Sequence, residues 1–319
     1  MIAAKKHSLL ADIQHDFEIR VPASIANLGP GFDTLAVAVQ LYLVLRVKKL
    51  PGRGQLNFRF LDADPCADNR IERGYRSLAG DDARALPSLL IEVQSEIPMQ
   101  AGLGSSAAAT VAGLRLYEAV AGPVRLQTIL NAACALEGHP DNAAASLLGG
   151  LTVSCQLQDG SVYASRLSWP DSLGFAVLTP KLPLGTKESR AVLPDNVARR
   201  DVVFNLQRVA LLLQSLQSQD FSMLKLALGD RIHQPSRADI VPGLAEVLQL
   251  EHRDLLGVCL SGSGPSIVGL AQKNLWEVGE LLASVYRESK IEYDLRLLQA
   301  HQECGDTNQV YRSGLLCCS

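Results

Sequence analysis

One short segment of the chain combines the residue types that bind phosphate. Residues 98–109 read PMQAGLGSSAAA, in which Gly102 and Gly104 are followed by two serines. Glycine lacks a Cβ, so the backbone there can bend sharply and approach an anion closely. The Ala-rich run 107–117 favours a helix, and the unpaired first N–H groups of that helix attract phosphate. The segment contains no Lys, so it is not the Walker phosphate loop and must recruit its cation from elsewhere.

Three other polar, glycine-containing clusters interrupt an otherwise apolar chain. They read VPASIANLGPGFD at 21–33, EGHPDN at 137–142 running on to LGG at 148–150, and LSGSGPS at 260–266. The four clusters, in this order, resemble the homoserine kinase family. That family belongs to the superfamily of galactokinase, homoserine kinase, mevalonate kinase and phosphomevalonate kinase. The resemblance covers roughly residues 17–300.

The resemblance implies ATP and Mg²⁺ as cofactors. The ATP-binding residues that it implies are Pro98, Ala101, Gly102, Leu103, Gly104, Ser105, Ser106 and Ala107, with Asn69 beside the adenine. Mg²⁺ prefers hard oxygen ligands, and the family pattern assigns them to Ser106 and Glu137. Arg70 stands where the family usually has Leu after Asn69. The loop at 260–266 is expected to buttress the phosphate loop.

The substrate site must recognise an ammonium, a carboxylate and a hydroxyl if the acceptor is an amino acid. Asp33 and Asn27 suit the ammonium and hydroxyl end. Arg190 and Arg237 suit the carboxylate, because a guanidinium can bind it through two parallel hydrogen bonds. Both arginines lie in segments, GTKESR and IHQPSR, that resemble elements of the family. A pair of arginines distinguishes an amino-acid kinase from a sugar or mevalonate kinase.

Four residues are expected to take part in the transfer itself: His139, Asn142, Thr186 and Arg190. His139 and Asn142 resemble residues that line the family's homoserine pocket. Mevalonate-type relatives have an Asp base at the position of Asn142, and an amide cannot accept a proton in that way. The resemblance therefore implies direct transfer, with His139 as general base kept as a second route. Thr186 would bind the γ-phosphate or the hydroxyl, and Asp141 is interpreted as structural, capping the next helix.

The activity implied by the resemblance is phosphorylation of L-homoserine by ATP, giving O-phospho-L-homoserine on the way to threonine. One alternative is a superfamily kinase acting on another small alcohol. A second is a catalytically silent relative that binds ATP or threonine as a sensor. Loss of Glu137, Ser106 or the glycines would favour the sensor, and all are present. No G-x-G-x-x-G opens a Rossmann unit, which excludes a dinucleotide-binding module.

The elements that position these residues are strands and helices in mixed order, so the expected class is α+β. Strand patterns occur at 17–21, 41–47, 88–94, 151–157, 162–167, 175–179, 256–260, 266–270 and 293–298. Helical patterns occur at 107–117, 125–136, 195–216 with Asp195 as N-cap, and 274–286. The resemblance implies two domains, the first like domain 2 of ribosomal protein S5 and the second ferredoxin-like, with ATP and substrate in the groove between them.

Composition limits the remaining possibilities. A chain of 319 residues fits two domains, expected at 16–170 and 171–303, with a flexible leader at 1–15 and a loose tail at 304–319. The net charge of −3 argues against a nucleic-acid partner. The longest apolar stretch is too short to cross a membrane, and no signal peptide is evident. Seven Cys without C-x-x-C spacing indicate reduced thiols in the cytoplasm. The family resemblance implies a homodimer.

Overall fold

The computed structural model describes residues 16–62, 68–182 and 184–303. The predicted leader and tail lie outside the described residues. The first of two sheets has the strand order β3-β4-β2-β5-β6, and β1 pairs with β2. Its strands are β1 (Phe17–Ala26), β2 (Leu35–Arg53), β3 (Leu56–Phe60), β4 (Pro87–Ser95), β5 (Leu151–Gln156) and β6 (Val162–Leu167). The pairing is antiparallel throughout, except between β3 and β4.

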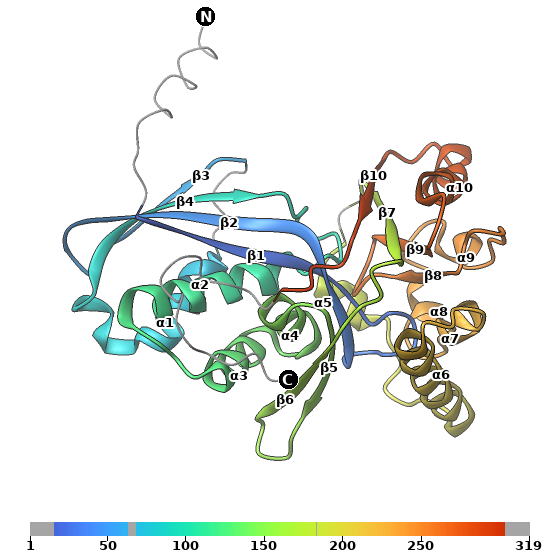
Figure 1. Cartoon of the computed structure of the whole chain (residues 1–319), viewed down its shortest axis with the longest axis horizontal. Helices are drawn as coiled ribbons and strands as arrows, with labels where there is room; N and C mark the ends of the chain where they lie inside the picture. The colour runs from blue at the N-terminus through green and yellow to red at the C-terminus, as the bar shows by residue number, and fades with distance from the viewer. Residues whose placement is uncertain (1–15, 63–67, 183, 304–319) are drawn as a thin grey trace, which may run out of the picture.

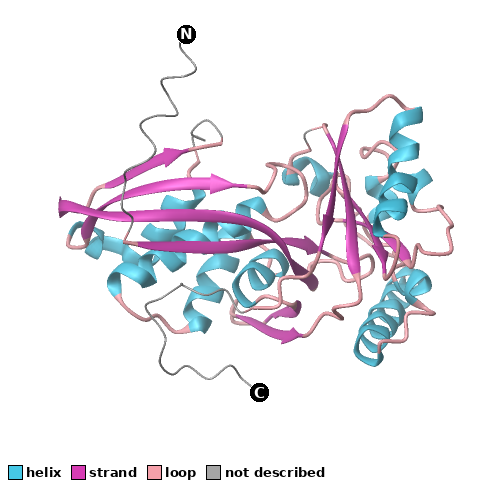
Figure 2. Cartoon of the chain, turned by 45° about the horizontal axis from the view of Figure 1, so that its top comes forward, coloured by secondary structure: helices cyan, strands magenta, loops and turns pink. Residues whose placement is uncertain are grey.

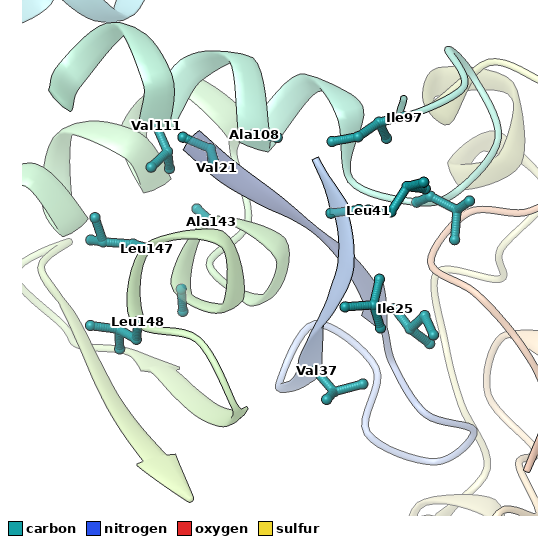
Figure 3. Close-up of a cluster of buried hydrophobic side chains, with 14 of the residues drawn as sticks. Val21, Ile25, Val37, Leu41, Ile97, Ala108, Val111, Ala143, Leu147 and Leu148 are labelled. Carbon is teal, nitrogen blue, oxygen red and sulfur yellow. The ribbon is translucent and has the colours of Figure 1, made fainter. Parts of the chain in front are cut away.

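Helices gather on one side of this sheet (Figure 1). They are α1 (Arg70–Ala79), the 3₁₀ turn η2 (Gly80–Arg84), α2 (Ser105–Ala121), α3 (Leu126–Glu137) and α4 (Asp141–Leu148). Figure 3 shows strand residues such as Val21 and Ile25 in the same cluster as Val111 and Leu147 from the helices. All four are almost completely buried. This shared core fixes the first turns of α2 and α4, where the polar clusters lie.

The second sheet is antiparallel, with the order β10-β7-β9-β8. Its strands are β7 (Gly174–Pro180), β8 (Gly257–Leu260), β9 (Ile267–Ala271) and β10 (Tyr293–Leu298). The helices of this half are α5 (Thr186–Ala191), α6 (Arg199–Ser218), α7 (Leu224–Ala227), α8 (Gln234–Arg237), α9 (Leu244–Val247) and α10 (Leu275–Glu288). Val278, Leu282 and Tyr286 of α10 belong to a second core, and Figure 2 shows the two halves side by side.

The mixture of strands and helices confirms the α+β class. Two local expectations were wrong. The helix expected from Asp195 begins at Arg199, with Ala198 as the N-cap. Asp141 is the first residue of α4, and Pro140 occupies the N-cap position without a side-chain cap. The domain limits at residues 170 and 171 remain a prediction. Within the described residues, no helix has the length and apolar character needed to span a bilayer.

Candidate active site

A cavity of about 610 Å³ brings the polar clusters together where the two halves meet. Its lining combines the phosphate loop and the start of α2 with the turn after β1, the 137–142 turn and residues 185–190. Arg237, Gly262 and Ser263 complete it from the second half. Segments far apart in the sequence are directly hydrogen-bonded here, as Asn27 is to Gly262, 235 residues away. The structure therefore gathers the motifs of the chain into one site.

The two glycines of the phosphate loop are required by its packing. Gly102 has a φ of +73° and Gly104 a φ of +71°, in the left-handed region that favours glycine. A Cβ on Gly102 would lie 2.3 Å from the Ser261 carbonyl oxygen. A Cβ on Gly104 would lie 2.2 Å from Ser24 Oγ. The atoms that lie close to these glycines belong to other segments of the protein. Protein contacts therefore shape the loop independently of a bound anion.

The loop at 260–266 supports the phosphate loop through hydrogen bonds. Ser261 Oγ donates to the Gly102 carbonyl at 2.6 Å. The Ser266 N–H donates to the Ala101 carbonyl at 3.2 Å. The contacts join the second half to the phosphate loop, as the sequence interpretation expected.

Glu137 and Ser106 are the predicted metal ligands, and both line the cavity. Thr110 Oγ1 donates to Glu137 Oε1 at 2.6 Å. Thr110 follows Ser106 by four residues on α2, so the two side chains share one face of that helix. Ser106 Oγ is buried and has no hydrogen-bond partner among the described residues. A buried hydroxyl oxygen without a partner, on the helix face that holds a carboxylate, fits the oxygen ligands of Mg²⁺.

Asp33 and Arg190 form a two-pronged ion pair. Arg190 Nη2 lies 2.6 Å from Asp33 Oδ1, and Nη1 donates to Oδ2 at 3.0 Å. Burial lowers the pKa of Arg190, but its hydrogen bonds and charge contact with Asp33 outweigh burial and raise it. Both side chains line the cavity and remain about one-third exposed, at 37% and 32%. Arg190 is the expected partner of the substrate carboxylate and Asp33 that of the ammonium, and in this structure the two side chains pair with each other.

Arg237 lies deeper, at 1% exposure. Its Nη1 donates to the Gly262 carbonyl at 2.9 Å and its Nε to the Ser189 carbonyl at 3.3 Å. Burial and then the charge of Arg190 lower the pKa of Arg237 to about 10. Both guanidinium carbons lie 5.5 Å from the centre of the Phe32 ring. A carboxylate beside these two arginines would offset their repulsion, which favours an anionic ligand here.

Asn27 was expected to bind the substrate directly, but both ends of its amide contact protein. Nδ2 donates to the Gly262 carbonyl at 3.0 Å. Oδ1 accepts from the Asp33 N–H at 3.1 Å. Asn27 itself has a φ of +71°, a conformation that Asn tolerates better than most residues. These bonds hold the turn that presents Asp33, and Asn27 also lines the cavity, so its contact with substrate stays a prediction.

The 137–142 turn forms a compact polar group around Asp141. Asp141 Oδ1 lies 2.6 Å from His139 Nδ1 and accepts from the Asn142 N–H at 2.7 Å. Burial lowers the pKa of His139, but the hydrogen bond and charge of Asp141 outweigh burial and raise it. Ser24 Oγ donates to Asn142 Oδ1 at 2.7 Å. Asp141 and Ser24 thus orient the two side chains expected to face the substrate.

The remaining predicted residues fall into two groups. Those that line the cavity are Pro98, Ala101, Gly102, Gly104, Ser105, Ser106, Ala107, Asn69 and Thr186. Leu103 does not: its side chain is 1% exposed and packs in the first core. Asn69 also caps α1, because its Oδ1 accepts from the N–H groups of Ile71 and Glu72.

Sequence reasoning missed two supporting residues. Ser24 lies within a recognised motif, but its bond to Asn142 spans 118 residues. Thr110 lies just beyond the phosphate loop, and its spacing of four residues from Ser106 was the available signal.

Comparisons with known proteins show the family to which the chain belongs. The family models "GHMP kinases N terminal domain" and "GHMP kinases C terminal" match residues 69–150 and 212–284. A homoserine kinase of Solibacter usitatus is 39% identical over 85% of this chain and 90% of its own length. One of Deinococcus radiodurans is 41% identical over 79% and 83%. The crystal structure of homoserine kinase from Cytophaga hutchinsonii superimposes with a TM-score of 0.77 at 25% identity, covering 92% and 97%. The chain belongs to the homoserine kinase family of the GHMP kinases.

Proposed function

We propose that this enzyme transfers the γ-phosphoryl group of ATP to the side-chain hydroxyl of L-homoserine. The observation that carries the proposal is the set of opposite charges, Asp33 with Arg190 and Arg237, in the cavity of the phosphate loop. A zwitterionic amino acid complements this set, with its ammonium at Asp33 and its carboxylate at the arginines. Galactose carries neither charge, and mevalonate has a carboxylate without an ammonium. The names of the curated relatives support the same acceptor.

The phosphate loop and the start of α2 would hold the triphosphate through backbone N–H groups. Ser106 and Glu137 would hold Mg²⁺, which neutralises charge on the phosphate oxygens when it is bound. The packing of Gly102 and Gly104 against the chain fixes the loop in advance. Such pre-positioning supplies most of the catalysis in phosphoryl transfer.

In direct transfer, the acceptor hydroxyl must be positioned against the γ-phosphate, and a general base is less important. The amide of Asn142 cannot accept the proton. Asp141 holds His139 through Nδ1 and raises its pKa, and His139 as general base remains the second route. Thr186, the first residue of α5, lies in the cavity wall and would donate to the γ-phosphate. In the proposed step, the substrate oxygen bonds to the γ-phosphorus and the bond to the bridging oxygen of ADP breaks. The hydroxyl proton passes to an oxygen of the transferred group.

The product identifies the reaction. With ATP, Mg²⁺ and L-homoserine, ³¹P NMR is expected to show a phosphate monoester on the side-chain oxygen, formed in a one-to-one ratio with ADP. Inorganic phosphate as the sole phosphorus product besides ADP, or an acyl phosphate, would overturn the proposal. The homodimeric state and cytoplasmic location remain predictions.

A further inference from the structure

Arg70, the first residue of α1, lies in the wall of the active-site cavity beside the predicted metal ligands. Its Nη1 is 3.4 Å from Glu137 Oε1 and donates to the Leu136 carbonyl at 3.4 Å. Its Nε lies 3.0 Å from Asp68 Oδ2. The side chain is 32% exposed, whereas that of Glu137 is 5% exposed. Arg70 therefore covers the accessible side of an almost buried carboxylate.

Rigid helix contacts place Arg70 there. α1 packs so tightly on α2 that a Cβ on Gly113 would lie 2.0 Å from the Ile71 carbonyl oxygen. Thr110, on the same helix as Gly113, holds Glu137 Oε1 at 2.6 Å. The backbone that carries Arg70 is thus fixed relative to Glu137, while the end of its side chain can change partner.

The site has a chemical need for such a cation. The phosphate loop, 98–109, contains neither Lys nor Arg. Arg190 is paired with Asp33, and Arg237 donates to backbone carbonyls. Arg296, the other arginine in the cavity wall, lies 4.0 Å from Asp294 on β10. Within the part of the chain that the structure describes, Arg70 is the cation in contact with Glu137. Its planar fork of donors matches the oxygens of a phosphate group.

We propose that Arg70 supplies the cation that the phosphate loop lacks: it pairs with Glu137 in the nucleotide-free site and binds a phosphate group of bound ATP. The proposal rests on ATP as the donor in the proposed function, and not on the identity of the acceptor. A metal ion held by Glu137 would displace Arg70 from Oε1, because both are attracted to the same oxygen.

Isothermal titration with ATP in EDTA tests this contact without turnover. Arg70→Met is expected to weaken ATP binding about tenfold, the usual scale for losing a hydrogen bond between charged groups. The matched control is Arg76→Met, on the same helix, where Arg76 pairs with Glu72 at 2.7 Å and neither residue lines the cavity. The control should bind ATP as the wild type does. Equal affinities of Arg70→Met and Arg76→Met would overturn the proposal.

A second background separates a direct phosphate contact from mere neutralisation of Glu137. In Glu137→Gln, the carboxylate charge is gone, and adding Arg70→Met should still weaken ATP binding about tenfold. If the effect of Arg70→Met disappears in that background, Arg70 acts only on Glu137 and the phosphate contact is refuted. Circular dichroism checks folding, and Arg70→Gln replaces Arg70→Met in every comparison if the latter unfolds.

Addition of Mg²⁺ gives a third readout. Since Arg70 competes with a metal ion for Glu137, Mg²⁺ should strengthen ATP binding by a larger factor in Arg70→Met than in the wild type. A smaller factor contradicts the competition. If the wild-type protein binds ATP but does not phosphorylate homoserine, the proposed acceptor fails while these binding results still decide the role of Arg70.

Discussion

The Asp33–Arg190 pair gives the sharpest test of substrate recognition. Replacing Arg190 by Met removes two hydrogen bonds to Asp33, at 2.6 and 3.0 Å, and one expected partner of the substrate carboxylate. Both side chains are about one-third exposed, so loss of the pair should cost less than about 1 kcal/mol of stability. A hydrogen bond to a charged substrate group contributes roughly 1.5–3 kcal/mol. The KM for L-homoserine should therefore rise about tenfold to hundredfold.

Two truncated substrates show which charge each residue recognises. The compound 3-amino-1-propanol keeps the ammonium and the hydroxyl, and 4-hydroxybutanoate keeps the carboxylate and the hydroxyl. In a coupled assay of ADP release, Arg190→Met should lower kcat/KM for 4-hydroxybutanoate and leave that for 3-amino-1-propanol nearly unchanged. Asp33→Asn should do the opposite. Arg287→Met, at an exposed ion pair with Glu280 on α10, is the matched control.

Equal effects of Arg190→Met on both truncated substrates would contradict a contact between Arg190 and the carboxylate. A KM for homoserine within about twofold of the wild-type value would contradict it too, because losing a contact worth about 1.5 kcal/mol raises KM by more than that. A loss confined to kcat would assign Arg190 to the transferred phosphoryl group instead of the carboxylate.

Three further predictions concern the rest of the site. Glu137→Gln should reduce kcat about hundredfold or more at ordinary Mg²⁺; turnover near the wild-type rate would place the metal elsewhere. Gly102→Ala should destabilise the protein by about 2–4 kcal/mol in urea unfolding, because it adds a Cβ 2.3 Å from the Ser261 carbonyl oxygen at a φ of +73°; an unchanged midpoint would show that the loop can move aside. The pKa of His139 is raised from 6.5 by Asp141 in spite of burial, so their pairing contributes stability that is complete below pH 6.5 and lost as pH rises through the raised pKa. His139→Asn should remove that part of the pH dependence of Tm, and an identical dependence in both proteins would contradict the pairing.

Local signals predicted the ends of the helices that matter most. The glycines and serines of 98–109 predicted a helix directly after the loop, at 107–117, and α2 begins two residues earlier, at Ser105. The 137–142 motif marked the junction of α3 and α4, because Gly138 ends one helix in the left-handed region and Asp141 begins the next. These features depend on neighbouring residues, so the sequence carries them directly.

The contacts that the sequence did not predict share a different cause. Asn27 lines the cavity, but its amide also donates to the carbonyl of Gly262, 235 residues away. Leu103 lies inside the phosphate motif, but its side chain packs in the first core and does not line the cavity. The support of Asn142 by Ser24 spans 118 residues. Each depends on which distant segment packs against the motif, and neighbouring residues in the sequence do not encode that.

In the proposed function, one cavity joins an ATP site to a site for a zwitterionic alcohol. The most direct measurement compares kcat/KM for L-homoserine, L-threonine, L-serine, mevalonate and galactose by ADP release with ATP and Mg²⁺. We expect turnover that is selective for L-homoserine. Efficient phosphorylation of mevalonate or galactose, without that of homoserine, would contradict the substrate site built from Asp33, Arg190 and Arg237.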